Sequence, residues 1–455
     1  MQGAEAWPGP PRRSAGHRSR YRRGRISRGA CGARGRGRGR ACARAGGDAC
    51  PRRCAGAVPL GPRAVTRIFL IAGEASGDAL GAALMAGLRQ LDPEVAFFGV
   101  GGPQMADEGL ESLFPMDELS VMGIAEVLPR YSALMRRIKQ CAAEVVRLSP
   151  DVLITIDSPD FCLRVARRVK AQSRVRTVHY VAPTVWAWRP GRAARMAEVI
   201  DQVLALFPFE PPYMEEVGLR CDFVGHPVVA QPRASAEEAL AFRDRHGIAR
   251  EAPLCLALPG SRRSEVMRMA PVFGRALQTV LAQHPDLRIV LPAAPGVAAL
   301  VTELTAAWPV APLVIDPRGD PDGAAGDKRA AFAAADLALA ASGTVSLELA
   351  ATDTPMVIAH DMNWLSRQII GRMLRLPTVT LVNIVSDTFA VPEFLGANCQ
   401  PGPIAAALCL LLEDPTYRAP QLEAMRLTMD RLGQGGERPG LRAARAVMDG
   451  LGAGR

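Results

Sequence analysis

Short apolar runs that alternate with helix-like stretches constrain the fold of this chain most. RIFLIAG at 67–73 is followed by ALGAALMAGLRQL at 79–91, and the rhythm continues through DVLITID at 151–157. Runs of this length that are apolar throughout are typical of strands buried on both faces of a parallel sheet. The alternation therefore predicts an α/β fold.

A proline-rich break, QPRASAEEA at 231–239, interrupts this rhythm, which restarts with PLCLALPG at 253–260. The chain has 455 residues and is 49% hydrophobic, so it can supply cores for two or three domains. We predict two Rossmann-like domains facing across a cleft, an acceptor-side and membrane-facing one at 66–229 and a donor domain at 230–455. We also expect the terminal helices to pack back on the first domain.

Residues 1–65 hold 16 Arg and no Lys against Glu5 and Asp48, so this segment carries +14 and the rest of the chain −4, out of a net charge of +10. The segment has too little apolar content to offset chain entropy, and we predict that it is disordered. It resembles an organellar transit peptide, an RNA-binding arm or a translated upstream sequence. We favour a mis-assigned start, because a folded domain begins abruptly afterwards. The mildly acidic remainder argues against a nucleic-acid partner.

Metal and membrane signals are weak. Cys50 and Cys54 make half a zinc site at best, and the other cysteines are scattered. We therefore expect reduced thiols, no metal and no cofactor. The sequence has no apolar run of about 18 residues, so any membrane contact would be peripheral.

Asp157 ends the apolar run at 152–156. Ligands of open α/β sheets bind beyond the carboxyl ends of the strands, and a buried carboxylate is costly unless it is paired or functional. We predict that Asp157 is catalytic. Asp160 opens the next helix, where a substrate contact and a simple cap are both reasonable interpretations.

The motif GEASGD at 73–78 lies between the first predicted strand and the next helix, where a dinucleotide-binding protein has its glycine-rich turn, but this turn carries two acidic residues. Glu74 and Asp78 would repel a pyrophosphate, whereas they and Ser76 suit a hydroxyl-rich ligand such as a sugar. We therefore predict that this turn contributes to substrate binding.

Two turns in the second half favour phosphate. PGSRRSEV at 259–266 combines a strand end, a helix start and arginine, and ASGTVSLELA at 341–350 repeats this architecture with hydroxyls. Capped helices with exposed arginines would look similar. The predicted nucleotide-binding residues are Gly260, Ser261, Arg262, Glu265, Ser342, Gly343, Thr344 and Glu348.

Two further stretches have open interpretations. In HYVAPTVWAWRPGR at 179–192, Trp186 either lines a substrate entrance or packs in a core. In 121–140, apolar side chains beside a basic helix would rest on an anionic bilayer, unless this is an ordinary helix with a solvated basic face. The proposed membrane contacts are Met122, Ile124, Val127 and Leu128.

Taken together, IAGEASGD, VMGIAEVLPR, IDSPDF, HYVAPTVWAWRPGR, LPGSRRSEV and ASGTVSLE resemble the lipid-A-disaccharide synthases over roughly residues 67–430. The resemblance implies a glycosyltransferase-B fold and transfer of diacylglucosamine from UDP to diacylglucosamine 1-phosphate. It also implies inversion to a β-1,6 link, without a metal. The expected location is cytoplasmic, peripheral on the inner face of the bacterial inner membrane, during lipid A and lipopolysaccharide synthesis.

The resemblance also adds residues. Asn383 and Glu393 match family positions that face the cleft, and Glu74 is a second catalytic candidate beside Asp157. Cys162 departs from the Asn that usually follows PDF in the family. The possible partners include a second copy of the chain. The alternatives are another UDP-sugar transferase or epimerase acting on a soluble sugar and, more remotely, a nucleic-acid-binding protein.

Overall fold

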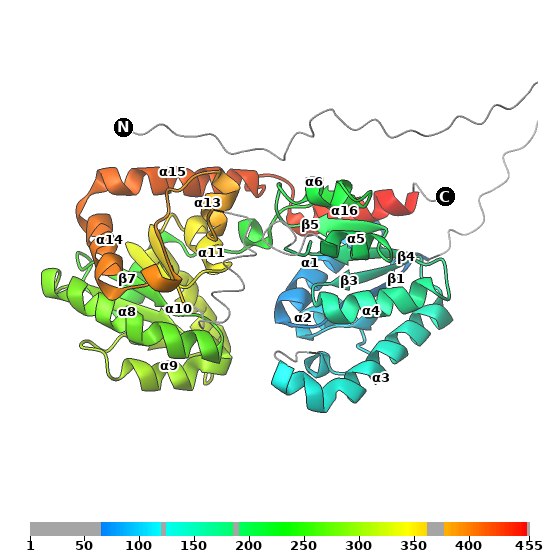
Figure 1. Ribbon diagram of the computed structural model, residues 1–455, viewed down its shortest axis with the longest axis horizontal. Helices are drawn as coiled ribbons and strands as arrows, with labels where there is room; N and C mark the ends of the chain where they lie inside the picture. The colour runs from blue at the N-terminus through cyan, green and yellow to red at the C-terminus, as the bar shows by residue number, and fades with distance from the viewer. Residues whose placement is uncertain (1–64, 120–123, 185–190, 362–376, 453–455) are drawn as a thin grey trace, which may run out of the picture. The chain divides into compact units, whose positions relative to one another are not determined.

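The computed structural model describes residues 65–119, 124–184, 191–361 and 377–452. Its framework is two six-stranded sheets, in which every described strand pair is parallel. Helices connect successive strands (Figure 1). The predicted α/β class with two parallel sheets is confirmed.

The first sheet has the strand order β2-β1-β3-β4-β5-β6. Strands β1 and β3 are apolar and almost fully buried, as expected for strands covered on both faces. The strands are β1 (Arg67–Ala72), β2 (Ala96–Val100), β3 (Val152–Ile156), β4 (Arg176–Tyr180), β5 (Gln202–Ala205) and β6 (Arg220–Phe223). The helices of this half are α1 (Ala75–Leu91), α2 (Pro103–Asp107), α3 (Ile124–Leu148), α4 (Pro159–Lys170), α5 (Gly191–Ala197) and α6 (Pro211–Glu215).

The second sheet has the order β12-β11-β10-β7-β8-β9. Its strands are β7 (Leu254–Leu258), β8 (Arg288–Pro292), β9 (Leu313–Ile315), β10 (Leu337–Ala340), β11 (Met356–His360) and β12 (Glu393–Leu395). Its helices are α7 (Ala236–Arg245), α8 (Arg263–Gln283), α9 (Ala298–Thr305), α10 (Pro321–Ala334), α11 (Val345–Ala351), α13 (Leu381–Ser386), α14 (Pro401–Glu413) and α15 (Pro415–Arg431). Short 3₁₀ turns lie at Met116–Glu118, Pro227–Ala230, Pro295–Val297 and Gly396–Asn398.

The strand order places a switch point in each sheet. In the first sheet, β2 and β3 lie on opposite sides of β1, so the strand order reverses at β1. In the second sheet, β8 and β10 lie on opposite sides of β7. A crevice forms at the carboxyl ends of the strands where the order reverses. The turns after β1 and β3, and those after β7 and β10, are therefore the expected places for ligands.

The last helix, α16 (Pro439–Gly452), returns to the first sheet and packs on α1. Figure 1 shows it in red among the green and blue elements of that half. The approach is close, because a Cβ added at Gly87 would lie 2.7 Å from the carbonyl oxygen of Gly440. The side chain of Gln202 on β5 also donates a 2.9 Å hydrogen bond to the carbonyl of Ala446.

Within the described ranges, no helix has both the length and the apolar character needed to cross a bilayer.

A buried arginine ties the base of the second sheet together. The Arg243 side chain on α7 is 8% exposed, and its guanidinium donates to the carbonyls of Ala252 and Ala334 at 2.8 and 2.6 Å. It also pairs with Asp336 at 3.0 Å, just before β10. One side chain thus joins α7, the start of β7 and the end of α10.

We expect Arg243→Met to lower the free energy of unfolding by about 2–4 kcal/mol, because it leaves buried carbonyls without donors. Urea denaturation measures this loss. The matched control is Arg250→Met, since Arg250 forms an exposed ion pair with Asp244 and each side chain is about 60% exposed. That change should cost less than about 1 kcal/mol. Equal losses in the two variants would contradict the assigned role of Arg243.

Candidate active site

Two carboxylates meet at the switch point of the first sheet. Glu74 immediately precedes α1 after β1, and Asp157 directly follows β3. The two strands pair in register, with Ala72 opposite Ile156, so the turns after them leave the sheet at the same level. The Glu74 carboxylate is near enough to that of Asp157 to raise the pKa of Asp157. The structure thus brings together the two residues predicted to be catalytic.

The environment of Asp157 favours its protonated form. Burial, followed by the neighbouring Glu74 carboxylate, raises the pKa of the Asp157 carboxyl to about 6, although the Ser158 N–H acts in the opposite direction. That N–H donates to Oδ1 of Asp157 at 2.8 Å. A base with a pKa near neutrality is effective, because it is ionised at working pH and still binds a proton strongly.

The backbone around Asp157 is unusual. Asp157 and Ser158 have φ values of 52° and 42°, in the left-handed region that most side chains avoid. Asp tolerates this region better than most residues. Such conformations persist where the surrounding structure holds them, and they cluster at functional sites. The turn directs the chain from β3 into α4.

Ser76 and Asp160 lie close to this pair in the sequence but have different environments. The Ser76 hydroxyl donates to Oε1 of Glu74 at 2.9 Å, which orients that carboxylate. Asp160 lies in the first turn of α4 with its side chain 94% exposed, and it forms a long ion pair of 3.8 Å with Arg192. Asp160 is therefore a solvated first-turn residue that favours the positive end of the helix.

Asp78 has a structural role that the sequence analysis did not predict. It is 2% exposed, and its carboxylate accepts hydrogen bonds from the backbone N–H groups of Gly102, Gln104 and Met105 at 2.8–3.0 Å. These groups belong to the start of α2, whose free N–H groups need acceptors. Asp78 therefore caps α2, and its predicted contact with a sugar stays a prediction.

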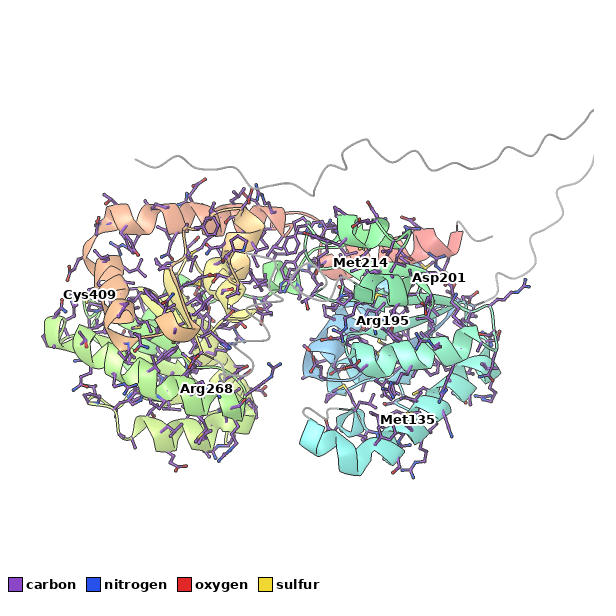
Figure 2. The ribbon with its side chains drawn as sticks, viewed as in Figure 1. Met135, Arg195, Asp201, Met214, Arg268 and Cys409 are labelled. Carbon is purple, nitrogen blue, oxygen red and sulfur yellow. The ribbon has the colours of Figure 1, made fainter. Side chains whose placement is uncertain are left out.

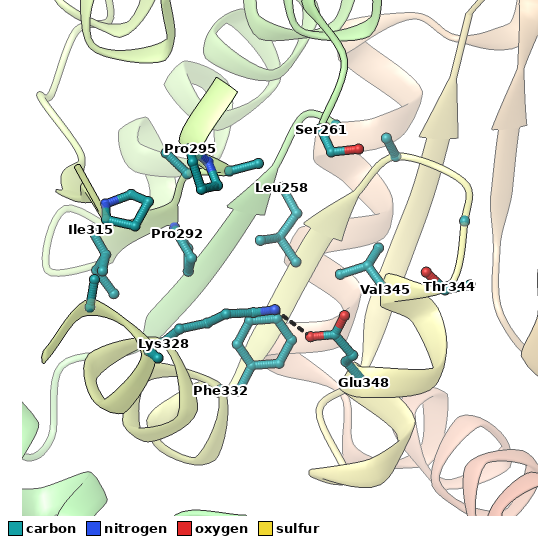
Figure 3. Close-up of a pocket in the computed structure, with 18 of the residues that line it drawn as sticks. Leu258, Ser261, Pro292, Pro295, Ile315, Lys328, Phe332, Thr344, Val345 and Glu348 are labelled. Atoms are coloured by element: carbon teal, nitrogen blue, oxygen red, sulfur yellow. Dashed lines mark hydrogen bonds and ion pairs between the residues drawn. The ribbon is translucent and has the colours of Figure 1, made fainter. Parts of the chain in front are cut away.

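A pocket of about 430 Å³ opens at the switch point of the second sheet (Figure 3). It is lined by the turns that follow β7 and β10, at Gly260, Ser261 and 341–345, together with Glu265 and Glu348. Apolar side chains, among them Leu258, Ile315 and Phe332, form much of the remaining wall. Two sequence motifs separated by about 80 residues thus line one cavity.

The first of these turns is already engaged by a carboxylate. Oε2 of Glu265 accepts long hydrogen bonds from the backbone N–H groups of Ser261 and Arg262, at 3.3 and 3.4 Å. The Arg262 guanidinium is 64% exposed, pairs with Glu265 at 3.3 Å and does not itself line the pocket. Glu265 is therefore a helix-capping residue of this turn, and a phosphate would compete with it.

The second turn is more open. Gly343 has a φ of 157°, and a Cβ added there would meet no atom within 4 Å. Thr344 precedes α11 without a side-chain capping bond, and Glu348 follows one turn later. The carboxylate of Glu348 forms an ion pair of 2.6 Å with Lys328 on α10.

Sequence reasoning missed Lys328 and Phe332, which both line the pocket. They lie on α10, far in sequence from either glycine-containing turn, inside a stretch that reads as an ordinary alanine-rich helix. Only the packing of α10 beside β7 and β9 brings them to the site.

Asn383 and Glu393 support a loop rather than a ligand. Asn383 is 1% exposed, and its amide exchanges two hydrogen bonds of 2.9 Å with the backbone of Val391. The carboxylate of Glu393 accepts from the Thr378 hydroxyl and from the backbone N–H of Thr380. These contacts give both side chains a structural role, and their predicted contact with substrate stays a prediction.

Several predicted residues lie outside what the structure describes. Trp186 and Met122 fall in 185–190 and 120–123. Ile124, Val127 and Leu128 belong to the first turns of α3, whose side chains are also outside the described set.

One group of potential metal ligands lies away from both sites. His284 at the end of α8 pairs with Glu413 at 3.0 Å, and Cys409 lies one turn before Glu413 on α14 (Figure 2). No sequence spacing indicated this group. Burial raises the pKa of the Cys409 thiol, which disfavours the thiolate that a metal binds. The His284–Glu413 pair is sufficient to explain the contact between the two helices.

Comparison with known proteins agrees with this arrangement. Residues 68–438 match the family model for lipid-A-disaccharide synthetase. The chain is 62% identical over 402 residues to a lipid-A-disaccharide synthase of Ruegeria pomeroyi, covering 88% of this chain and 99% of that protein. It is 49% identical over 384 residues to the Rhodospirillum centenum enzyme, covering 84% and 94%.

Solved structures with a similar fold are more distant. A UDP-GlcNAc 2-epimerase of Neisseria meningitidis has a TM-score of 0.55 at 12% identity, over 86% of this chain and 99% of that one. A glycosyltransferase of Rickettsia africae has a TM-score of 0.53 at 11% identity, over 86% and 98%. At these identities the likeness shows the fold alone. The family model and the close relatives go further, and the chain belongs to the lipid-A-disaccharide synthase family.

Proposed function

We propose that this chain transfers a 2,3-diacylglucosamine from UDP to the 6-hydroxyl of 2,3-diacylglucosamine 1-phosphate, with inversion to a β-1,6 link. The products are lipid A disaccharide 1-phosphate and UDP. Membership of the family supports a UDP-sugar donor and a lipid-linked acceptor. The observation that carries the proposal is the pairing of Glu74 with Asp157 at one switch point, while a nucleotide-sized pocket lies at the other.

The acceptor hydroxyl must lose a proton as it attacks the anomeric carbon, and we assign Asp157 as the base that takes it. Glu74 assists by raising the proton affinity of Asp157, and Ser76 orients Glu74. Attack from the face opposite UDP breaks the bond to the phosphate oxygen and inverts the anomeric centre.

The leaving UDP gains negative charge, which the donor side must stabilise. We assign this task to Arg262, to Ser342 and to the backbone of the turn at 342–344. We assign Glu348, which lines the pocket, to accept hydrogen bonds from the ribose hydroxyls. The apolar wall at Leu258 and Ile315 suits the flat face of a base.

We also propose peripheral binding at the cytoplasmic face of the inner membrane. The motivation is the acylated substrates together with the apolar and basic stretch at 121–140. Met122, Ile124, Val127 and Leu128 remain the proposed contacts. A homo-oligomer also remains a proposal.

The function is tested by measuring UDP release with the diacylated donor, with and without the diacylated acceptor. We expect rapid release only when both lipids are present, with one disaccharide formed per UDP. An enzyme that instead inverts a hydroxyl of soluble UDP-N-acetylglucosamine, or transfers its sugar to a soluble acceptor, would contradict the proposal.

We expect Asp157→Asn to reduce transfer by about a hundredfold or more, the usual scale for losing a general base. UDP affinity should hardly change, because the nucleotide pocket belongs to the second sheet. The wild-type rate should fall as the pH is lowered through about 6, where Asp157 becomes protonated. Steady-state kinetics across pH and UDP calorimetry provide these measurements.

The same substitution should stabilise the fold at neutral pH. The pKa of Asp157 is raised, so its ionised form opposes folding above about pH 6, and this effect disappears below about pH 4. Asn accepts the left-handed backbone and should gain on the order of 1–3 kcal/mol at pH 7.5. Asp160→Asn is the control, and it should change the transfer rate and the free energy of unfolding little. An active Asp157→Asn with an inactive Asp160→Asn would reverse the roles, and activity in both would make Glu74 the leading candidate.

We expect Arg262→Ala to raise the dissociation constant of UDP by about ten- to a hundredfold, because a charge-assisted contact to phosphate contributes about 1.5–3 kcal/mol. Calorimetry measures the change. Arg263→Ala is the matched control, since Arg263 is likewise an exposed arginine, next in the chain, and is not assigned to the diphosphate. Unchanged UDP affinity in Arg262→Ala would place the diphosphate at 342–344 alone.

A further inference from the structure

Lys328 is the one cationic side chain among the described residues that line the nucleotide pocket. It lies within α10, outside the two phosphate-favouring motifs at 259–266 and 341–350. The function proposed above gives it no task. Its position beside Glu348 nevertheless makes it part of the same site (Figure 3).

Two contacts hold the Lys328 ammonium in place. Its Nζ donates to Oε2 of Glu348 at 2.6 Å, the ion pair drawn as a dashed line in Figure 3. The same nitrogen lies 5.3 Å from the ring centre of Phe332, one helical turn further along α10. A cation restrained by both a carboxylate and an aromatic face has fewer accessible rotamers than a free lysine.

The ion pair also fixes the carboxylate. Oε2 of Glu348 is bonded to Lys328, and within the described part of the chain no hydrogen bond to Oε1 is formed. The side chains of Lys328 and Glu348 are 44% and 29% exposed, so a ligand can reach them from the pocket. A carboxylate oxygen can accept two hydrogen bonds, which matches the two vicinal hydroxyls of a ribose.

The charges in the pocket require such a cation. Glu265 and Glu348 both line it, and a nucleoside diphosphate adds further negative charge. Without Lys328, the carboxylate at 348 would be unpaired and would repel the ligand. With Lys328 present, the Lys328–Glu348 pair has no net charge, and the Glu348 carboxylate can still accept hydrogen bonds.

We infer that Lys328 is a positioning residue that holds Glu348 for the ribose hydroxyls, so that the pocket selects ribonucleoside over 2′-deoxyribonucleoside diphosphates. The inference rests on the proposed function, because it takes UDP as the occupant of the pocket. Lys328 acts through Glu348, to which it is bonded.

The test measures the dissociation constants of UDP and 2′-deoxy-UDP by calorimetry for the full chain and three variants. The wild-type protein should bind UDP about tenfold or more tightly than the deoxy compound, since one hydrogen bond to a charged group is lost. In Lys328→Met, UDP binding should weaken about tenfold, and the UDP preference should shrink to within about threefold. Lys328→Arg keeps the ion pair and should retain the preference.

The control is Arg329→Met, which removes the same charge from the exposed neighbour outside the pocket lining and should change neither constant. Equal weakening of both ligands in Lys328→Met would overturn positioning in favour of simple charge attraction. An unchanged preference in that variant would overturn the inference while leaving the proposed function intact. A wild-type protein that does not bind UDP would overturn both.

Discussion

The parallel direction of every described strand pair is the constraint on which this structure depends. Each connection must return the chain to the amino end of the next strand, so the turns that follow the strands gather at one edge of each sheet. Where the order reverses, at β1/β3 and β7/β10, neighbouring turns separate into a crevice. Both candidate sites lie at these points.

The two sites solve opposite electrostatic problems. The first brings two carboxylates together in partial burial, which makes Asp157 hold a proton more strongly than an ordinary aspartate. The second places one cation, Lys328, and the backbone N–H groups of the turn after β7 beside two carboxylates, Glu265 and Glu348. One edge is therefore suited to removing a proton and the other to holding a charged leaving group.

The sequence predicted the strands, the turns and the residues directly after them, because the local pattern of apolar runs determines where a buried parallel strand ends. Asp157, Glu74, Gly260 and Thr344 were identified in this way. The roles of Asp78, Asn383 and Glu393 were not predictable, since the backbone groups that they bond come from other segments. Lys328 was missed because its place depends on how α10 packs against the sheet, which no local pattern records.

Glu265 accepts hydrogen bonds from the backbone N–H groups of Ser261 and Arg262 at the edge of the nucleotide pocket. An anion that binds these N–H groups must first displace the Glu265 carboxylate. A carboxylate tethered to the turn behaves as a competitor whose local concentration does not fall on dilution, and such concentrations reach the millimolar range for short tethers. A lone inorganic anion has only these few contacts with which to displace it. A ligand that also contacts the apolar wall and Glu348 has more contacts with which to displace Glu265 than a lone anion has.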